Sequence, residues 1–219
     1  MEEKSGKLTV KEGPMLFSAP MVRALLDGSK KQTRRIMKPQ PVPIPGEPGK
    51  HWWPSNAAQS MMRVEDGFQK HPGIFDDACP HGQPGNRIWV RETFCLDDDG
   101  HEEWPVFRAD GAKLPQRQPT RKPARWTPSI HMPRAASRIL LEIVSVRVER
   151  LNDCSEADAL AEGVKAEPCD HVRLSCEEIG CCGPTAKGMY AALWDHINGA
   201  GAWADNPWVW VIEFKRVTP

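Results

Sequence analysis

The stretch Arg138–Arg150, RILLEIVSVRVER, decides the fold of this chain. Apolar and polar residues alternate along it with the period of two that is typical of a half-buried β-strand. The alternation is imperfect. The odd-numbered positions hold the apolar Ile139 and Ile143 but also the charged Arg147 and Glu149. The pattern therefore predicts a long strand that carries a β-bulge, or a bent strand of a β-barrel.

Six further elements are expected around this strand, each from a local pattern. They are a strand over Met15–Ser18, a helix from Pro20 that ends before Gly28, a strand over Arg87–Phe94, a helix over Ser155–Glu162 with Asp158 completing a capping box, a helix over Thr185–Asn198 and a strand over Trp208–Lys215. Strands and helices do not alternate as in βαβ units. The expected fold class is therefore α+β, a small mixed β-barrel with flanking helices.

The length of 219 residues suits one domain that carries large insertions. Residues 1–13 are polar and are expected to form a flexible tail, and residues 14–219 to form the domain. The chain has 21 prolines, and these are dense in two expected insertions at about 39–85 and 96–128. A third insertion, at about 165–183, is rich in cysteine.

The composition and charge of the chain argue against several classes of protein. The 29 Lys and Arg residues balance 29 Asp and Glu residues, which argues against a protein that coats nucleic acid through its overall charge. A local basic groove remains compatible with this balance. No stretch approaches the roughly 20 apolar residues of a membrane span, and the N-terminus lacks the apolar core of a secretory signal. A cytoplasmic protein is therefore expected.

A cationic segment, Gly28-Ser29-Lys30-Lys31-Gln32-Thr33-Arg34-Arg35, follows the first expected helix. It is expected to be a loop in which Gly28 permits a tight turn and Lys30 and Arg35 reach a shared cleft, with the Thr33 hydroxyl between them. A second interpretation is a solvated basic loop, because cations suit the C-terminal end of a helix. The spacing alone favours neither.

The pattern Gly28-x-Lys30 with Arg35 resembles the G-x-K-x-x-x-x-R signature of ASCH domains, a superfamily of PUA-like β-barrels. Other segments resemble the phage and prophage members of that superfamily. These segments are Cys79–Gly85, Trp89–Thr93, Pro128–Arg134, Ala159–Val164 and Asn206–Val211. The resemblance implies binding of RNA or modified bases, and a host-cytoplasmic location for a phage-encoded protein.

One branch of that superfamily hydrolyses N(4)-acetylcytidine with a Lys, a Thr and a Glu. The resemblance places these roles on Lys30, Thr33 and Glu162. Thr33 would be the nucleophile, Lys30 the base once burial and neighbouring cations favour loss of its proton, and Glu162 would orient Lys30 or protonate the leaving amine. The alternative is that Lys30 and Glu162 form only an ion pair.

Five further residues are candidates for binding substrate or nucleic acid. Arg34 and Arg35 are candidates for phosphate contacts. Arg91 and Glu92 are neighbours on a strand and must face opposite ways, so they either anchor a loop or one of them contacts the ligand. His131 is either a surface residue or a ligand contact.

Tryptophan is unusually frequent in this chain, with nine residues against one tyrosine. Trp208 and Trp210 share one face of a strand, and we expect them to pack against the helix that carries Trp194. Trp52 and Trp53 lie in the Pro-rich segment and are candidates for exposed stacking on a base.

A thiol-rich segment provides a candidate metal site. Cys169, His171, Cys176 and Cys181 offer the four N and S ligands that structural zinc requires. Their spacing lacks a clean C-x-x-C pair, so a loop of free thiols is the alternative. The proposed hydrolysis itself requires no cofactor.

Four functions follow as hypotheses from these observations. They are an amidohydrolase acting on a modified nucleoside or on RNA, a non-catalytic reader of RNA or modified bases, a ribonuclease, and a phage accessory protein that binds a host protein. Binding that weakens with salt would indicate phosphate contacts and would separate the second hypothesis from the fourth.

Overall fold

The alternating segment around Ile143 forms the centre of the fold in the computed structural model. It becomes strand β8 (Leu140–Arg150), which pairs antiparallel with β9 (Trp208–Val217) and with β5 (Arg87–Arg91). The structure describes residues 10–54, 63–65, 78–98, 102–116, 123–165 and 185–217.

Two strands from the N-terminal part complete this sheet, whose order is β1-β5-β8-β9-β2. Strand β1 (Glu12–Leu16) runs parallel to β5, and β2 (Gln32–Ile36) runs antiparallel to β9. Two separate hairpins flank the sheet: β3 (Val42–Pro43) with β4 (His51–Trp52), and β6 (Phe94–Asp98) with β7 (Glu103–Phe107). The α+β class is confirmed, and within the described ranges the sheets do not close into a barrel.

The helices begin and end where their capping residues predict. Helix α1 (Ala19–Leu26) has a proline in its first turn, and Gly28 follows its end in the left-handed region at φ 79°. Helix α4 (Glu156–Ala161) starts with the expected capping box, and α5 (Ala186–Asn198) is capped by the Thr185 hydroxyl. Short 3₁₀ helices cover Arg108–Asp110, Ser129–His131, Arg134–Ala136 and Leu151–Asp153. No helix in these described ranges has the length and apolar character of a membrane span.

The expected bulge is present in β8. Ile143 pairs with Phe214 and Ser145 with Glu213, so Val144 is an extra residue between two paired positions and is 51% exposed. The bulge explains the imperfect parity, because the buried side chains change from odd to even positions across it.

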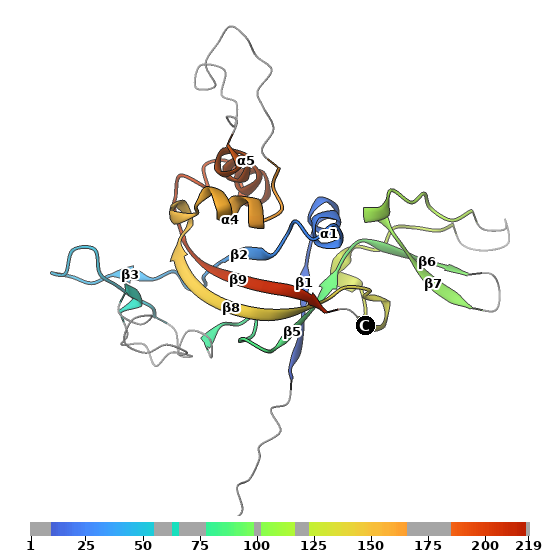
Figure 1. Cartoon of the computed structure of the whole chain (residues 1–219), viewed down its shortest axis with the longest axis horizontal. Coiled ribbons are helices and arrows are strands. Elements are labelled where there is room, and N and C mark those ends of the chain that lie inside the picture. The colour runs from blue at the N-terminus through green and yellow to red at the C-terminus, as the bar shows by residue number, and fades with distance from the viewer. Residues whose placement is uncertain are drawn as a thin grey trace, which may run out of the picture.

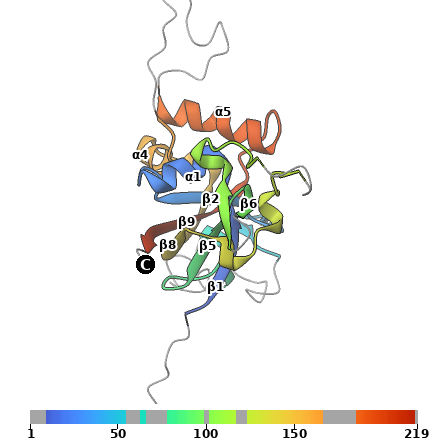
Figure 2. The same ribbon diagram turned by 90° about the vertical axis from the view of Figure 1, so that its right-hand side faces the viewer.

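Strand β9 separates two hydrophobic clusters. Trp208, Trp210, Ile212 and Phe214 pack into the larger cluster with β5 and β8, while the alternate residues face α4 and α5. Figures 1 and 2 show α4 and α5 together over this second face of the sheet. The expectation that Trp208 and Trp210 pack against the Trp194 helix was therefore wrong, because the smaller Val209 and Val211 occupy that face.

The expected insertions contribute to the fold. Trp53 is 3% exposed, its indole nitrogen donates to the Pro39 carbonyl at 2.9 Å, and its ring meets Trp210 edge-on. It is therefore a core residue and not an exposed stacking residue, whereas Trp52 is half-buried. The second insertion, expected to be irregular, contains most of the β6–β7 hairpin.

The cationic segment is the clearest difference from expectation. Gln32–Ile36 is a strand and not a loop, with Thr33 opposite Ile212 and Arg34 opposite Val211. Its charged residues can occupy a strand because buried carboxylates from α4 and β8 compensate them, a condition that the local sequence does not reveal.

Candidate functional site

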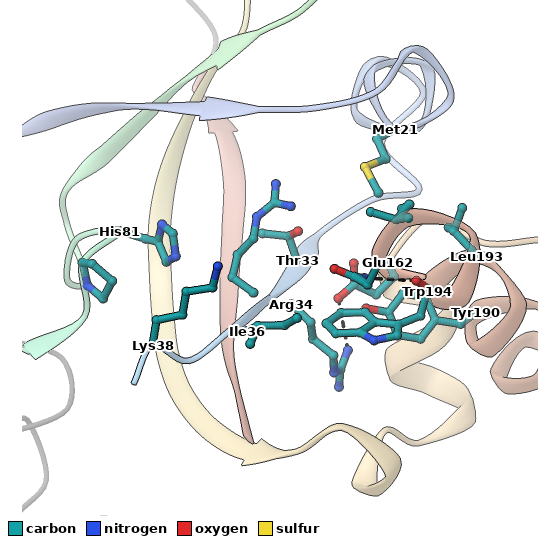
Figure 3. A pocket seen from close by; sticks show the side chains of 14 residues that line it. Met21, Thr33, Arg34, Ile36, Lys38, His81, Glu162, Tyr190, Leu193 and Trp194 are labelled. Carbon is teal, nitrogen blue, oxygen red and sulfur yellow. Dashed lines mark hydrogen bonds and ion pairs between the residues drawn. The ribbon is translucent and has the colours of Figure 1, made fainter. Parts of the chain in front are cut away.

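A half-open cavity of about 370 Å³ lies between β2, helix α5 and the turn at Pro80 and His81 (Figure 3). Its wall is mixed. Met21, Leu193 and Trp194 provide apolar surface, and β2 contributes Thr33 and two arginines. A cavity of this size, with a few polar groups on apolar walls, is typical of small-molecule sites.

Lys30 and Glu162 form a buried ion pair next to this cavity. The Lys30 Nζ donates to Glu162 Oε2 at 2.7 Å and to the Glu162 carbonyl at 2.9 Å. The two side chains are 0% and 2% exposed. Burial lowers the pKa of Lys30 from its usual value, and the charge of Glu162 opposes this only in part. Glu162 lines the cavity, whereas Lys30 lies behind it.

Arg34 and Tyr190 fix the orientation of Glu162. The Arg34 guanidinium contacts Glu162 Oε1 at 3.2 Å and Glu149 Oε1 at 2.6 Å. Burial alone would lower the pKa of Arg34, but Glu162 and Glu149 raise it well above its usual value. The Tyr190 hydroxyl donates to Glu162, and burial together with this carboxylate raises the Tyr190 pKa. Both oxygens of Glu162 are therefore held by donors.

Thr33 is the hydroxyl-bearing residue of β2 on this cavity. It is 2% exposed and lines the same cavity as Glu162 (Figure 3). The strand pairing with β9 fixes its backbone. Its place on the cavity wall makes its hydroxyl the candidate nucleophile on this strand.

Gly163 allows α4 to approach the cationic strand closely. Its φ is +85°, and a Cβ at this position would lie 2.7 Å from the Ala24 Cβ and 3.0 Å from the Lys30 Cβ. Lys30 and Glu162 form an isolated antiparallel backbone bridge at this contact. Only glycine meets both requirements, the left-handed backbone and the lack of space.

A second group of side chains forms a basic wall of the cavity: Arg35, Lys38 and His81. The Arg35 Nη2 donates to the Leu16 carbonyl at 2.8 Å, and its guanidinium lies 5.5 Å from the centre of the Phe17 ring. Burial, assisted by the charge of Arg35, lowers the pKa of His81 to about 4, so its imidazole is neutral at pH 7.

Three of the expected site residues lie elsewhere. Glu92 is 1% exposed and binds Arg138, with Oε1 and Nε 2.9 Å apart. Arg91 donates to the Met132 carbonyl at 3.1 Å, and His131 is exposed on a 3₁₀ helix. None of the three lines the cavity, and both charged residues tie the 132–138 segment to β5.

The structure thus brings together Lys30, Thr33, Glu162, Arg34 and Arg35. Lys38, His81 and Tyr190 also line the cavity, but sequence reasoning did not select them as site residues. The sequence did contain a signal for His81, which lies in the Cys79-Pro80-His81-Gly82 turn. It also contained one for Tyr190, which is the one tyrosine of the chain.

The proposed zinc ligands Cys169, His171, Cys176 and Cys181 lie outside the described residues. Among the residues that the structure does describe, no three His, Cys, Asp or Glu side chains are grouped to hold a metal ion. Cys79, Cys95 and Cys154 are buried.

Comparison with known proteins finds no relative of this chain. No family model, no curated protein and no solved structure matches the chain.

Proposed function

We propose that this protein is an amidohydrolase that removes the acyl group from an N-acylated nucleoside of the N(4)-acetylcytidine type. One observation carries the proposal: Thr33 and Glu162 line the same cavity, and a buried lysine stands behind that carboxylate. A nucleophile, a proton acceptor and a buried cation are the groups that amide hydrolysis uses.

Each group has a role in this proposal. The Thr33 oxygen attacks the acyl carbonyl and its proton passes to Glu162, the carboxylate that faces the cavity. Glu162 then delivers the proton to the leaving nitrogen, and cytidine departs. Water hydrolyses the resulting threonine ester, which releases the acid and restores the hydroxyl. Lys30 and Arg34 hold the carboxylate charged and in place.

Membership of the ASCH superfamily and a PUA-like fold are part of this proposal. The Gly28-x-Lys30 and Arg35 pattern supports them. So do the α+β architecture and the position of helix α1 directly before the cationic strand. A cytoplasmic location belongs to the same proposal.

The test is a chromatographic assay of purified protein with N(4)-acetylcytidine. Wild type should release cytidine, and Thr33→Ala, Glu162→Gln and Lys30→Ala should each lower kcat by at least about 100-fold. Thr33→Ser should retain activity because it keeps the hydroxyl. Thr127→Ala, a threonine outside the cavity, is the matched control and should behave as wild type. Absence of cytidine release by folded wild type would refute the proposal.

A second function is favoured by the aromatic wall of the cavity. Tyr190 and Trp194 line it, and aromatic side chains bind splayed-out bases by stacking. In this alternative the protein is a non-catalytic reader of modified bases. Binding measured by Trp fluorescence, together with the assay of cytidine release, distinguishes the two functions. A reader would bind N(4)-acetylcytidine without releasing cytidine, and its affinity would be equal in wild type and Thr33→Ser.

A further inference from the structure

The basic wall of the cavity differs from the two ion-paired arginine clusters, those around Arg34 and Arg138. Arg34 contacts three carboxylates, and Arg138 is paired with Glu92 and Asp110. Within the described ranges, by contrast, Arg35 and Lys38 form no ion pair with any carboxylate, although both line the cavity. Burial lowers the pKa of Arg35 and the charge of Glu162 opposes this only in part, so an anionic ligand would stabilise the charged guanidinium further.

Arg35 is held in place for such a ligand. One of its terminal nitrogens is committed to the Leu16 carbonyl, and the Phe17 ring supports the guanidinium plane. A guanidinium has five N–H donors in a rigid fork, so donors remain for an anion. Arginine fixed in this way suits the geometry of a phosphate group.

His81 and Lys38 reach the same space from two other segments. Figure 3 shows the Lys38 side chain extending toward His81, on the side of the cavity remote from Glu162 and Tyr190. His81 is half-buried and neutral at pH 7, and its ring can supply one N–H donor. Lys38 and His81 thus lie away from Glu162 in the cavity, whereas the charge of Arg35 acts on both Glu162 and His81.

We propose that Arg35, Lys38 and His81 form a subsite for a terminal phosphate group, so that a nucleoside monophosphate binds more tightly than the free nucleoside. The inference rests on the proposed function only for the position of the base. The volume of about 370 Å³ is within the range that such ligands occupy, and Met21 and Leu193 add apolar surface to its wall.

The experiment is calorimetric titration of the full chain with cytidine 5′-monophosphate and with cytidine. Neither compound is a substrate for deacylation, so the measurement is independent of catalysis. Charge-assisted hydrogen bonds to phosphate should make the monophosphate bind at least about tenfold more tightly. Arg35→Gln and Lys38→Gln should each reduce this preference for the monophosphate over cytidine.

Lys31→Gln is the matched control, because Lys31 is an exposed neighbour whose side chain is not in the cavity. It should retain the preference for the monophosphate. Lys38→Gln alters an exposed side chain, so its result does not depend on a buried residue being tolerated. Equal affinity for the two ligands in wild type, or equal losses in Lys31→Gln and Lys38→Gln, would overturn the subsite.

A third ligand distinguishes a terminal phosphate from the phosphodiester of a polynucleotide backbone. The dinucleotide CpC carries only a diester, and it should bind no better than cytidine. Binding of CpC as tight as that of the monophosphate would overturn the terminal-phosphate assignment and indicate a polynucleotide backbone. The subsite and the proposed hydrolysis fail separately, since cytidine release is measured with an unphosphorylated substrate.

Discussion

Two adjacent arginines of β2 show how the environment of a residue decides its role. Arg34 is enclosed by Glu149, Glu162 and Asp158, so its charge is satisfied within the protein. Arg35 donates to a backbone carbonyl and otherwise faces the cavity. Both arginines line the cavity, so the carboxylates that enclose Arg34 give it a structural role and leave Arg35 for a ligand.

Gly163 provides a prediction at the scale of one residue. Gly163→Ala places a methyl group against Ala24 and Lys30 in a left-handed backbone conformation, and we expect it to cost about 2–4 kcal/mol of unfolding free energy. Urea unfolding measures this cost. Gly111→Ala is the control, since Gly111 has a similar φ of +74° and open space, and should cost only about 1 kcal/mol. Equal costs would show that the close contact is unimportant.

Helix α4 is the element that connects the network. Its N-terminal Asp158 accepts hydrogen bonds from Ser155 and Gln32, and its C-cap is Glu162. The helix has only six residues, so its own hydrogen bonds contribute little, and side-chain contacts at both ends must hold it.

Asp158 gives a pH-dependent prediction for this element. Burial alone would raise its pKa, but hydrogen bonds from Ser155 and Gln32 and the charge of Arg34 lower it well below the usual 3.8. A lowered pKa means that the carboxylate stabilises the fold above about pH 4 and loses this effect as the pH falls further. Asp158→Asn should therefore be less stable than wild type by about 1–2 kcal/mol at pH 7.

The difference between wild type and Asp158→Asn should shrink between pH 4 and pH 2. Arg34 and Arg147 stay charged over this range, so the change reports the carboxyl group. Urea titrations at pH 7, 4 and 2 provide the measurement. A difference that stays constant with pH would contradict the assignment.

At the scale of the whole molecule, the Pro-rich segment is part of the main core. Trp53 joins the cluster that contains Ile88, Ile143 and Trp210, although the segment resembles an insertion in sequence. The segment and the sheet are therefore expected to unfold together and not as a separate flap.

Trp53→Ala tests this integration. Removal of a buried indole should cost about 3–5 kcal/mol and lower the single thermal transition. Trp104, which is 41% exposed on the β6–β7 hairpin, is the control, and Trp104→Ala should cost under about 1 kcal/mol. A second, earlier transition in the Trp53 variant would instead identify the segment as an independent unit.

Several elements were predictable because their causes are local. The bulged strand, the capping box at Ser155, the helix after Thr185 and the glycine after α1 all follow from neighbouring residues. Propensity, capping and side-chain period act over a few positions, so one sequence suffices to predict them.

Within the site, sequence reasoning placed Lys30, Thr33 and Glu162 together only through a resemblance. The residues that enclose Arg34 and orient Glu162 were not selected, because Glu149 and Tyr190 are about 40 residues apart and on different elements. Strand β2 was expected to be a loop, since its positive charges are tolerable in a sheet only when distant carboxylates cover them.

The amino-acid sequence by itself determined the period, the caps and the turns, which depend on interactions between near neighbours. The tertiary structure alone decided which face of β9 meets the helices, that Trp53 is buried, and that Arg35, Lys38 and His81 share a cavity with Thr33. These features arise from strand register and from the packing of segments far apart in the chain. Burial and charge compensation there are properties of the assembled fold and not of any local stretch.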